Sequence, residues 1–406
     1  MWKVEPIAPI KSVMYRSETP KELFCYSPGI CALSSGRLVG TMDRGGPKAP
    51  ADMGQVFLSD DRGESWRKVA TFPFLHARPF VAGSSLYVLG HNGELRIIRS
   101  DDDGETWSDY ASLTHGDAWH QAPASVIYSG DYVYLVMESF DPQTTGWPVR
   151  ALRPVLMRGN IHTDLTKQEN WTFAKVNSFE ELVDYEKTDY FGIPFYSLDR
   201  DTGVEPGGRY CAPIGWLETN VVQIHDPNHI WYDPTGHTFY LFMRAHTGRT
   251  GYCCVAKVVE KEDGTMEMET VKAPTGKTLL YLPMPGGQMK FHILYDEVSR
   301  LYWLLSSQAT DSMIDPEKMP SDRYNLPDNE RHRLQLHFSK NCVDWCFAGL
   351  IDMGATALES RHYASMTISG DDLYILSRTG DKDAATPHNT NMISLHEVKN
   401  FRELVY

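Results

Sequence analysis

The sequence predicts an all-β chain built from repeated small sheets, and two kinds of repeat predict it. A ten-residue stretch at 57–66 recurs at 98–107, and both copies follow the pattern Ser-x-Asp-x-Gly-x-x-Trp. A second theme occurs six times: an apolar strand, a turn with Gly or Asp, and a strand rich in aromatic and β-branched residues. No long amphipathic helix interrupts these repeats. A single all-β domain over 1–406 is therefore preferred to two domains.

The strand pairs lie at residues 31–40, 80–89, 125–136, 230–242, 293–304 and 365–376. Each pair is interpreted as the two inner strands of a four-stranded sheet, completed by the strands that follow. Six such sheets arranged around a central channel form a six-bladed β-propeller, which is the fold we predict. Seven blades is the alternative, with the extra blade within 177–215 or at the joined termini. A strand at 12–15 is expected to join the last blade and close the ring.

Two segments break the rhythm of the repeats, at 177–215 and 311–331. The first contains an acidic run and a Gly/Pro-rich stretch, and the second is rich in Pro, Asp and Arg. We interpret both as loop insertions. Long loops on a rigid scaffold are where binding residues concentrate.

The ten-residue motif has the chemistry of a hairpin turn. Asp61 is expected to accept hydrogen bonds from backbone N–H groups of its own turn, and Gly63 to supply a positive φ. Trp66 is expected to bury its ring at the base of the hairpin and to find an acceptor for its indole N–H. The copy at 98–107 has the same residue types at the same spacing. A degraded third copy at 338–345 lacks the glycine and is one residue short.

This motif resembles the Asp-box, or bacterial neuraminidase repeat, of the sialidase superfamily, whose members are β-propellers. The resemblance implies the propeller fold for most of the chain. It implies little about the reaction, since Asp-boxes lie on the rim and also occur in proteins that are not enzymes.

Charge and composition exclude several classes of partner. The formal net charge is −14 over 406 residues, which argues against nucleic acid or an anionic membrane surface. No apolar run approaches the roughly 20 residues that span a bilayer. We see no signal peptide, and seven cysteines is an odd number, so a reducing cytosol is the simplest expectation. Removal of a leader would instead indicate a periplasmic or secreted protein.

Neither a metal nor another cofactor is expected. The aspartate runs at 60–61 and 101–103 lack the 12-residue loop of a calcium site. The glycine pairs at 45–46 and 207–208 are not followed by a helix with the lysine signature of a phosphate loop. The cysteines show no paired Cys-x-x-Cys spacing.

Candidate catalytic residues lie at the ends of predicted inner strands, which meet at the channel mouth. Glu218 precedes one apolar strand, Arg244 follows the next, and Tyr363 lies within 361–366. This layout resembles the sialidase segments that carry the catalytic glutamate, a carboxylate-binding arginine and the tyrosine nucleophile. The resemblance implies these three roles for Glu218, Arg244 and Tyr363.

The chemistry of those three residue types is consistent with an anionic sugar. Such a sugar repels a carboxylate nucleophile, whereas a neutral phenol activated by a neighbouring glutamate is not repelled. Arginine suits a sugar carboxylate because its planar guanidinium contacts both oxygens.

The chain departs from the sialidase pattern in its arginines. The segment at 26–30 has serine where the first arginine is expected. Arg361 and Arg378 are candidates for the missing third arginine, and Arg78 is a further residue that could reach the channel. Asp43 is a candidate acid/base. Without the full set of arginines, sialic acid itself is in doubt as the substrate.

Histidines at the blade mouths support a rival function. His91, His120 and His292 lie there, and the chain also resembles propeller polysaccharide lyases and rhamnose–glucuronate-cleaving enzymes. In that chemistry Arg244 neutralises a uronate, a histidine takes the C5 proton, and Tyr363 or an imidazole protonates the leaving oxygen.

Three functions follow from this reading. The primary hypothesis is an exo-acting glycosidase of sialidase type, acting on a terminal or acidic sugar of a glycan. The second is the uronate-directed lyase. The third is a glycan-binding propeller without catalysis, in which Glu218 and Arg244 form only a buried ion pair and the histidines are core residues.

Overall fold

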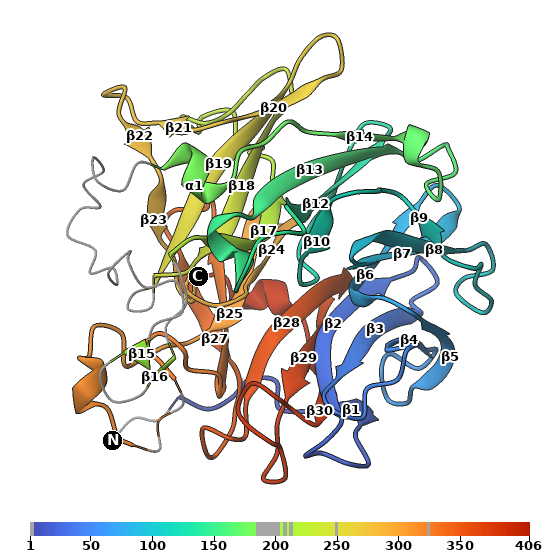
Figure 1. Cartoon of the computed structure of the whole chain (residues 1–406), viewed down its shortest axis with the longest axis vertical. Helices are drawn as coiled ribbons and strands as arrows, with labels where there is room; N and C mark the ends of the chain where they lie inside the picture. The colour runs from blue at the N-terminus through green and yellow to red at the C-terminus, as the bar shows by residue number, and fades with distance from the viewer. Residues whose placement is uncertain are drawn as a thin grey trace.

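Six antiparallel sheets follow one another around the molecule in the computed structural model (Figure 1). The structure describes residues 4–183, 204–205, 209–210, 214–247, 251–321, 323 and 325–406. The predicted six-bladed β-propeller is confirmed. Much of the expected insertion at 177–215 lies outside the described residues.

The first three blades take up the chain from residue 24 to residue 173. Their strands are β2 (Phe24–Ala32), β3 (Leu38–Gly45), β4 (Gly54–Ser59) and β5 (Arg67–Phe72) in blade 1; β6 (Leu75–Ala82), β7 (Ser85–Asn92), β8 (Glu94–Ser100) and β9 (Ala111–Ser112) in blade 2; and β10 (Ala118–His120), β11 (Val126–Ser129), β12 (Tyr132–Phe140), β13 (Arg153–Asn160) and β14 (Trp171–Phe173) in blade 3.

The other three blades complete the ring. Their strands are β17 (Trp216–Val222), β18 (Thr238–Ala245), β19 (Tyr252–Glu260), β20 (Met266–Glu269) and β23 (Tyr281–Pro283) in blade 4; β24 (His292–Asp296), β25 (Leu301–Ser307), β26 (Arg333–Ser339) and β27 (Cys346–Met353) in blade 5; and β28 (Arg361–Ser369), β29 (Asp372–Thr379), β30 (Met392–Val398) and β1 (Ser12–Arg16) in blade 6.

Short elements decorate the connections between these strands. They are the helix α1 (Phe179–Leu182), the 3₁₀ turns η1 (Pro148–Arg150), η2 (Gln168–Asn170), η3 (Pro316–Lys318) and η4 (Phe401–Leu404), and the hairpins β15 (Val204–Glu205) with β16 (Arg209–Tyr210) and β21 (Val271–Lys272) with β22 (Thr278–Leu279). No helix in the described ranges is long and apolar enough to cross a membrane.

The N-terminal strand closes the ring, as predicted. Strand β1 pairs antiparallel with β30, with Ser12 opposite Leu395, and so supplies the outermost strand of the last blade. Figure 1 shows this blue strand beside the red C-terminal blade. A strand near the start of the chain thereby shares one sheet with three strands near its end.

One predicted strand pair, at 230–242, is wrong in its first half. The innermost strand of blade 4 is β17, which ends at Val222, and residues 223–237 form no strand. The carboxylates of Asp226 and Asp233 accept hydrogen bonds from the backbone N–H groups two residues later, at 2.9 Å each. These Asx turns compete with the extended conformation that the aromatic residues favour.

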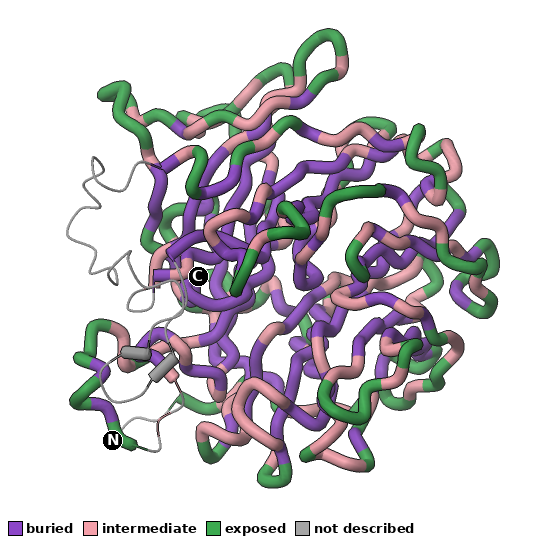
Figure 2. Tube along the Cα trace, viewed as in Figure 1, coloured by how far each residue is buried: buried purple, intermediate pink, exposed green. Residues whose placement is uncertain are grey.

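The hydrophobic core lies mainly between neighbouring blades. Tyr134 of blade 3 stacks on Phe239 of blade 4 with ring centroids 4.3 Å apart. Residues of blades 5 and 6 share another cluster, in which Trp303 contacts Phe401 edge-on at 4.9 Å. Figure 2 shows buried residues through the interior and exposed ones at the peripheral loops. The central strands are buried on both faces, which makes the scaffold rigid.

The Ser-x-Asp-x-Gly-x-x-Trp turns have the predicted geometry. In the first, Asp61 Oδ1 accepts from the backbone N–H of Ser65 at 2.9 Å, and Gly63 has φ of +82°. The Trp66 indole N–H donates to Ser12 Oγ at 3.2 Å. In the second, Trp107 donates to a carbonyl of its own turn at 2.9 Å.

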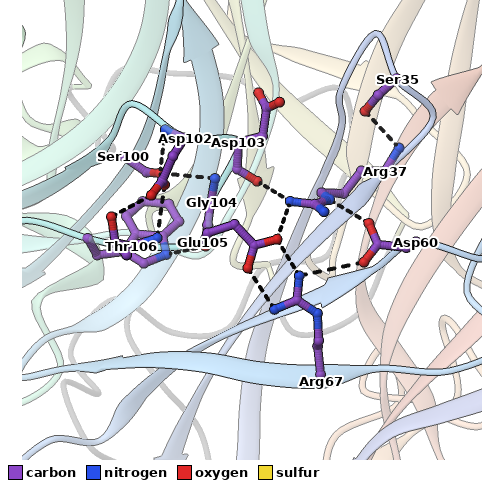
Figure 3. Close-up of polar contacts among 11 residues, drawn as sticks. Ser35, Arg37, Asp60, Arg67, Ser100, Asp102, Asp103, Gly104, Glu105 and Thr106 are labelled. Carbon is purple, nitrogen blue, oxygen red and sulfur yellow. Dashed lines mark hydrogen bonds and ion pairs between the residues drawn. The ribbon is translucent and has the colours of Figure 1, made fainter.

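An ion-pair network joins these two turns across blades 1 and 2 (Figure 3). Arg37 contacts Asp60 at 2.6 Å and Glu105 at 2.8 Å, and Arg67 contacts Glu105 at 2.5 Å. Because all four side chains reach solvent, each pair contributes on the order of 1 kcal/mol or less to stability.

Candidate active site

Four innermost strands carry a β-bulge at which a residue other than glycine has a positive φ. These residues are Ser27 (+47°), His76 (+53°), Glu218 (+58°) and Tyr363 (+50°), in blades 1, 2, 4 and 6. The left-handed conformation costs such a residue roughly 1–2 kcal/mol. Bulges redirect side chains and are common beside active sites. The strain therefore marks this end of the blades as a candidate site.

Buried carboxylates from the preceding blade hold two of these bulges. Asp43 Oδ1 accepts a hydrogen bond from the backbone N–H of His76 at 3.0 Å. Glu138 Oε1 accepts from the backbone N–H of Thr219, the residue after Glu218, at 2.9 Å. Asp43 and Glu138 are both 0% exposed. A carboxylate with no exposed surface fixes the backbone of the neighbouring blade.

A buried lysine holds the bulge of blade 6 in the same way. Lys290 of blade 5 is 2% exposed, and its ammonium group donates to the carbonyl of Ala364, next to Tyr363. Burial lowers the pKa of Lys290 to about 7. The sequence analysis missed both Lys290 and Glu138. The available signal was a charged residue beside or within an apolar strand, since Lys290 precedes β24 and Glu138 lies in β12.

Glu218, Arg244 and Tyr363 meet as the sequence predicted. Arg244 Nη1 lies 3.2 Å from Glu218 Oε2 and donates to the Tyr363 hydroxyl at 2.9 Å. Glu218 and Arg244 are 1% and 5% exposed, whereas Tyr363 is partly exposed. The Arg244 Nε donates to the backbone carbonyl of Gln288 at 2.8 Å, which fixes the guanidinium.

The electrostatics of this cluster set the protonation of Glu218 and Tyr363. Burial alone raises the pKa of Glu218, but the Arg244 charge and the Tyr363 hydroxyl bring it below its ordinary value. Burial and the Glu218 charge raise the pKa of Tyr363, against the opposing effect of Arg244. At neutral pH the pair is therefore a carboxylate beside a neutral phenol.

Two further arginines contact Tyr363. The Arg378 guanidinium carbon lies 4.3 Å from the ring centroids of both Tyr26 and Tyr363. That of Arg331 lies 5.6 Å from the Tyr363 ring, and its Nη1 lies 3.0 Å from His362 Nδ1. Arg378 was predicted to belong to the site, and Arg331 was missed. Cations over aromatic faces are attracted by the ring quadrupole.

Histidines gather on the other side of the site, in blades 2 and 3. His76 Nδ1 lies 3.1 Å from His91 Nε2, and the His76 and His120 rings lie edge to face at 5.4 Å. His120 Nδ1 lies 3.3 Å from Glu138 Oε2, and its ring contacts Trp147 at 5.2 Å.

These histidines differ in their access to solvent. Burial and then the neighbouring His120 lower the pKa of His91 to about 3. Burial also holds the pKa of His76 well below its ordinary value, so both rings are neutral at pH 7. His120 keeps 12% of its side chain exposed. The described residues contain no group of three or more His, Cys, Asp or Glu side chains placed to hold a metal ion.

Asp43 differs from the expected acid/base. It has no exposed surface, and burial raises its pKa to about 7. One oxygen holds the His76 backbone and the other has no hydrogen-bond partner in the described part of the chain. A group that protonates a leaving oxygen must reach the substrate. The geometry therefore favours a positioning role for Asp43.

Three other predicted residues are not at the site. Arg78 is 1% exposed and donates to backbone carbonyls of blade 3 at 3.0 and 3.2 Å. His292 accepts from the backbone N–H of Met366 through Nδ1 at 3.0 Å. Arg361 is paired with Asp352 at 2.7 Å between blades 5 and 6. All three are mostly buried and use their polar atoms within the protein, so they hold blades together.

His76 was missed although the sequence contained a signal for it. It precedes the apolar part of its inner strand by the same offset at which Glu218 and Tyr363 precede theirs. Arg331 lay in the expected loop insertion at 311–331, where spacing carries no information.

Comparison with solved structures relates the fold of the chain to that of known propeller proteins. No protein-family model and no curated protein sequence matches the chain. Among solved structures, the chain is similar to the Penicillium chrysogenum α-L-arabinanase complexed with arabinobiose. The identity is 11%, the TM-score is 0.53, and the match covers 98% of this chain and 100% of that one.

Sialidases are similar to a comparable degree. The Trypanosoma rangeli sialidase, in complex with the inhibitor DANA, has 14% identity and a TM-score of 0.56 over 99% of this chain, which spans 60% of that enzyme. The intramolecular trans-sialidase of Ruminococcus gnavus, in complex with oseltamivir carboxylate, has 12% identity and a TM-score of 0.55, covering 98% of this chain and 99% of that one. At such identities the likeness shows the fold: the chain has the six-bladed propeller architecture of these proteins, as the resemblance to sialidases implied.

Proposed function

We propose that this protein is a retaining exo-glycosidase of sialidase type, with Tyr363 as the nucleophile. The observation that carries the proposal is the contact of Arg244 with both the Tyr363 hydroxyl and the Glu218 carboxylate, at 2.9 and 3.2 Å. This places a neutral phenol, an ionised carboxylate and a fixed cation together on a strained backbone. The fold shared with propeller glycosidases supports the same reaction class.

The first step forms a covalent glycosyl–enzyme. Glu218 takes the phenolic proton as the Tyr363 oxygen attacks the anomeric carbon, and the bond to the leaving oxygen breaks. A proton donor completes the leaving alcohol. In the second step water attacks the same carbon and gives a proton to the donor that was deprotonated in the first step. Tyr363 departs and recovers its proton from Glu218, and the configuration is retained. Arg244 stabilises the negative charge that develops on the phenol.

We assign the proton donor to His120. Its side chain is partly exposed, and the buried Glu138 carboxylate lies 3.3 Å behind it, as expected for a histidine that exchanges a proton with substrate. Asp43, the alternative, is fully buried and holds His76.

The substrate class that we propose is a terminal sugar carrying an anionic group. Arg244 is compensated by Glu218, but Arg378 is 3% exposed and forms no ion pair with a carboxylate in the described parts of the chain. Its Nη1 lies 3.4 Å from both Nε2 and the backbone carbonyl oxygen of His388, and its guanidinium lies over the faces of Tyr26 and Tyr363. A buried cation without a counter-ion is costly unless a ligand supplies one.

Covalent trapping tests the proposal. A panel of fluorosugar glycosyl fluorides, including a 3-fluorosialosyl fluoride, is incubated with the protein and followed by intact mass. One glycosyl unit is expected to attach to Tyr363, as located by peptide mapping, and Tyr363→Phe is expected to acquire none. Attachment to another residue, or an inverted product by NMR, would contradict the assignment.

The lyase remains the second candidate because the imidazole rings of His76, His91 and His120 form a cluster. Uronate-containing glycans distinguish the two reactions, since a lyase creates a C4–C5 double bond that absorbs ultraviolet light. Absorbance that appears with these glycans and disappears in His120→Gln would favour elimination. Binding without any turnover would favour the non-catalytic propeller.

A further inference from the structure

A second concave site lies between blades 4 and 5, and the proposed function does not use it. The cleft has a volume of about 600 Å³. Blade 4 contributes Gly251 and the segment from Pro283 to Gly286, and blade 5 contributes Gln308, Gln335 and the turn from Val343 to Cys346.

That turn is the degraded third copy of the Ser-x-Asp-x-Gly-x-x-Trp motif. Asn341 replaces the aspartate and accepts from two backbone N–H groups of the turn, at 2.8 and 2.9 Å. Cys342 replaces the glycine at a φ of +58°. The turn therefore keeps its backbone shape.

The tryptophan of this turn differs from its counterparts. The indole N–H groups of Trp66 and Trp107 donate to protein acceptors. Trp345 lines the cleft, and its indole N–H is buried and has no hydrogen-bond partner in the described ranges. The degraded copy thus leaves an unpaired donor in a residue of the cleft wall.

Gln288 supplies a second unused polar group. It is 1% exposed and lines the cleft, and neither its amide nitrogen nor its amide oxygen has a partner among the described residues. A buried amide normally satisfies both atoms within the protein or through a bound molecule. The side chain lies at the cleft wall, since a Cβ built on Gly251 would approach its oxygen to 3.3 Å.

We propose that this cleft binds a neutral saccharide unit. Its polar groups are the amides of Gln288, Gln308 and Gln335, the indole of Trp345 and a serine hydroxyl, and the described residues that line it include no lysine or arginine. Amides donate and accept, as sugar hydroxyls do. The proline and methionine surfaces from Pro283 to Pro285 offer apolar contact to the C–H face of a sugar ring.

Charge separates this site from the channel mouth. Among the described residues that line the cleft, the carboxylate is that of Asp344, which already accepts from Asn341 Nδ2 at 3.0 Å. These residues offer an anionic sugar no counter-charge, whereas Arg244, Arg331 and Arg378 surround Tyr363. The inference does not depend on turnover, and it stands whether the protein is a hydrolase, a lyase or a binding module.

The test uses the full chain carrying Tyr363→Phe, labelled with ¹⁵N-tryptophan. Lactose, cellobiose and arabinobiose are each titrated to millimolar concentration while the indole N–H resonances are recorded. The Trp345 signal is identified as the one missing after Trp345→Phe. We expect a saturable shift of that signal with at least one of the three sugars.

Matched variants locate the binding. Gln288→Met is close in shape and removes both amide atoms, so binding should weaken by about tenfold. Trp345→Phe should weaken binding measured by calorimetry, whereas Trp107→Phe, at the corresponding position of blade 2, should leave it unchanged. Absence of a Trp345 shift with all three sugars would overturn the proposal, and so would a shift that Gln288→Met leaves undiminished. Tighter binding of 3′-sialyllactose than of lactose in the cleft would also overturn it.

Discussion

The turns on the rim and the bulges at the channel mouth use the same backbone device in different ways. Both place a residue at positive φ, with Gly63 in the first motif turn and Glu218 and Tyr363 in two of the bulges. On the rim the carboxylate that shapes the first turn makes local contacts, such as that between Asp61 and Ser65, four residues apart. At the mouth Arg244 contacts Tyr363 across 119 residues of sequence.

The comparison shows where this protein tolerates strain. In each complete rim turn a glycine adopts a positive φ at little cost, and the residue before it, Arg62 or Asp103, also has a positive φ. At the mouth, reactive residues such as Glu218 and Tyr363 have the left-handed conformation. Buried charged groups, Glu138 and Lys290, hydrogen-bond to the backbone beside them. Strain of this kind persists where the surroundings fix it, and such positions are typical of functional sites.

Tyr363→Phe should have the largest effect at the mouth and almost none on the fold. It removes the proposed nucleophile, so kcat should fall at least about 10³-fold. Only one hydrogen bond, from Arg244, is lost, so the free energy of unfolding should change by about 1 kcal/mol. The loss of kcat is measured with a substrate of the sugar that labels the protein in the trapping experiment, and the change in stability is measured by urea unfolding. Full activity would show that the mouth is strained for another reason.

In the folded protein the pKa of Asp43 is raised from 3.8 to about 7, so its ionisation lowers the free energy of unfolding by up to about 4 kcal/mol between low and high pH. Asp43→Asn should remove this pH dependence. Because the folded-state pKa is raised, this contribution is complete below pH 4 and is lost as pH rises through 7. The variant should flatten the curve between pH 4 and 7.

Asp61→Asn on the rim is the control, with the opposite sign. Hydrogen bonds from Ser65 and Ser59 lower the pKa of Asp61 to about 2. Its contribution is therefore present above pH 4 and is lost as pH falls through 2. Unfolding measured across pH 2–8 compares both variants, and parallel curves would contradict the contrast between rim and mouth.

His120→Gln should reduce kcat/KM on the order of 10²-fold for substrates with alkyl leaving groups. A dinitrophenyl leaving group needs no proton, so the variant should then approach normal activity. Asp52→Asn, in the exposed loop between β3 and β4, is the matched control. If Asp52→Asn lost activity in a way that depends on the leaving group and His120→Gln did not, the proton donor would have to be assigned to that loop instead of His120.

Gly63→Ala should destabilise the fold by about 2 kcal/mol or more, through backbone strain and overpacking. The added Cβ would lie 2.0 Å from Leu395 Cδ2 in the closing blade. Gly36→Ala is the control, because Gly36 also has a positive φ but has nothing within 4 Å. It should cost about 1 kcal/mol, and equal losses in urea unfolding would show that ring closure is not involved.

Arg37→Gln should have the smallest effect, below about 1 kcal/mol. It removes the contacts with Asp60 and Glu105 that join two rim turns (Figure 3). The loss should shrink as salt is raised, because exposed charges are screened. If Arg37→Gln lowered the free energy of unfolding by more than this, and salt did not change the loss, the ion pairs would behave as buried rather than exposed ones.

The sequence determined the repeating architecture of this protein. Hydrophobic alternation, turn residues and the two complete motif copies are local features, so six blades, the closing strand at Ser12 and the turn geometry around Asp61 could be predicted. The resemblance of short segments to those of sialidases also pointed to Glu218, Arg244 and Tyr363, which lie in β17, β18 and β28.

Tertiary structure decided which charged residues face the mouth and which lie inside the protein. Arg78 and Arg331 are both arginines near strand ends, yet one bonds to backbone carbonyls of the next blade and the other lies over Tyr363. Their partners come from other blades, at separations that no local pattern encodes. The burial of Asp43 and the anchoring roles of Glu138 and Lys290 depend likewise on how neighbouring blades pack, which is settled only when the ring closes.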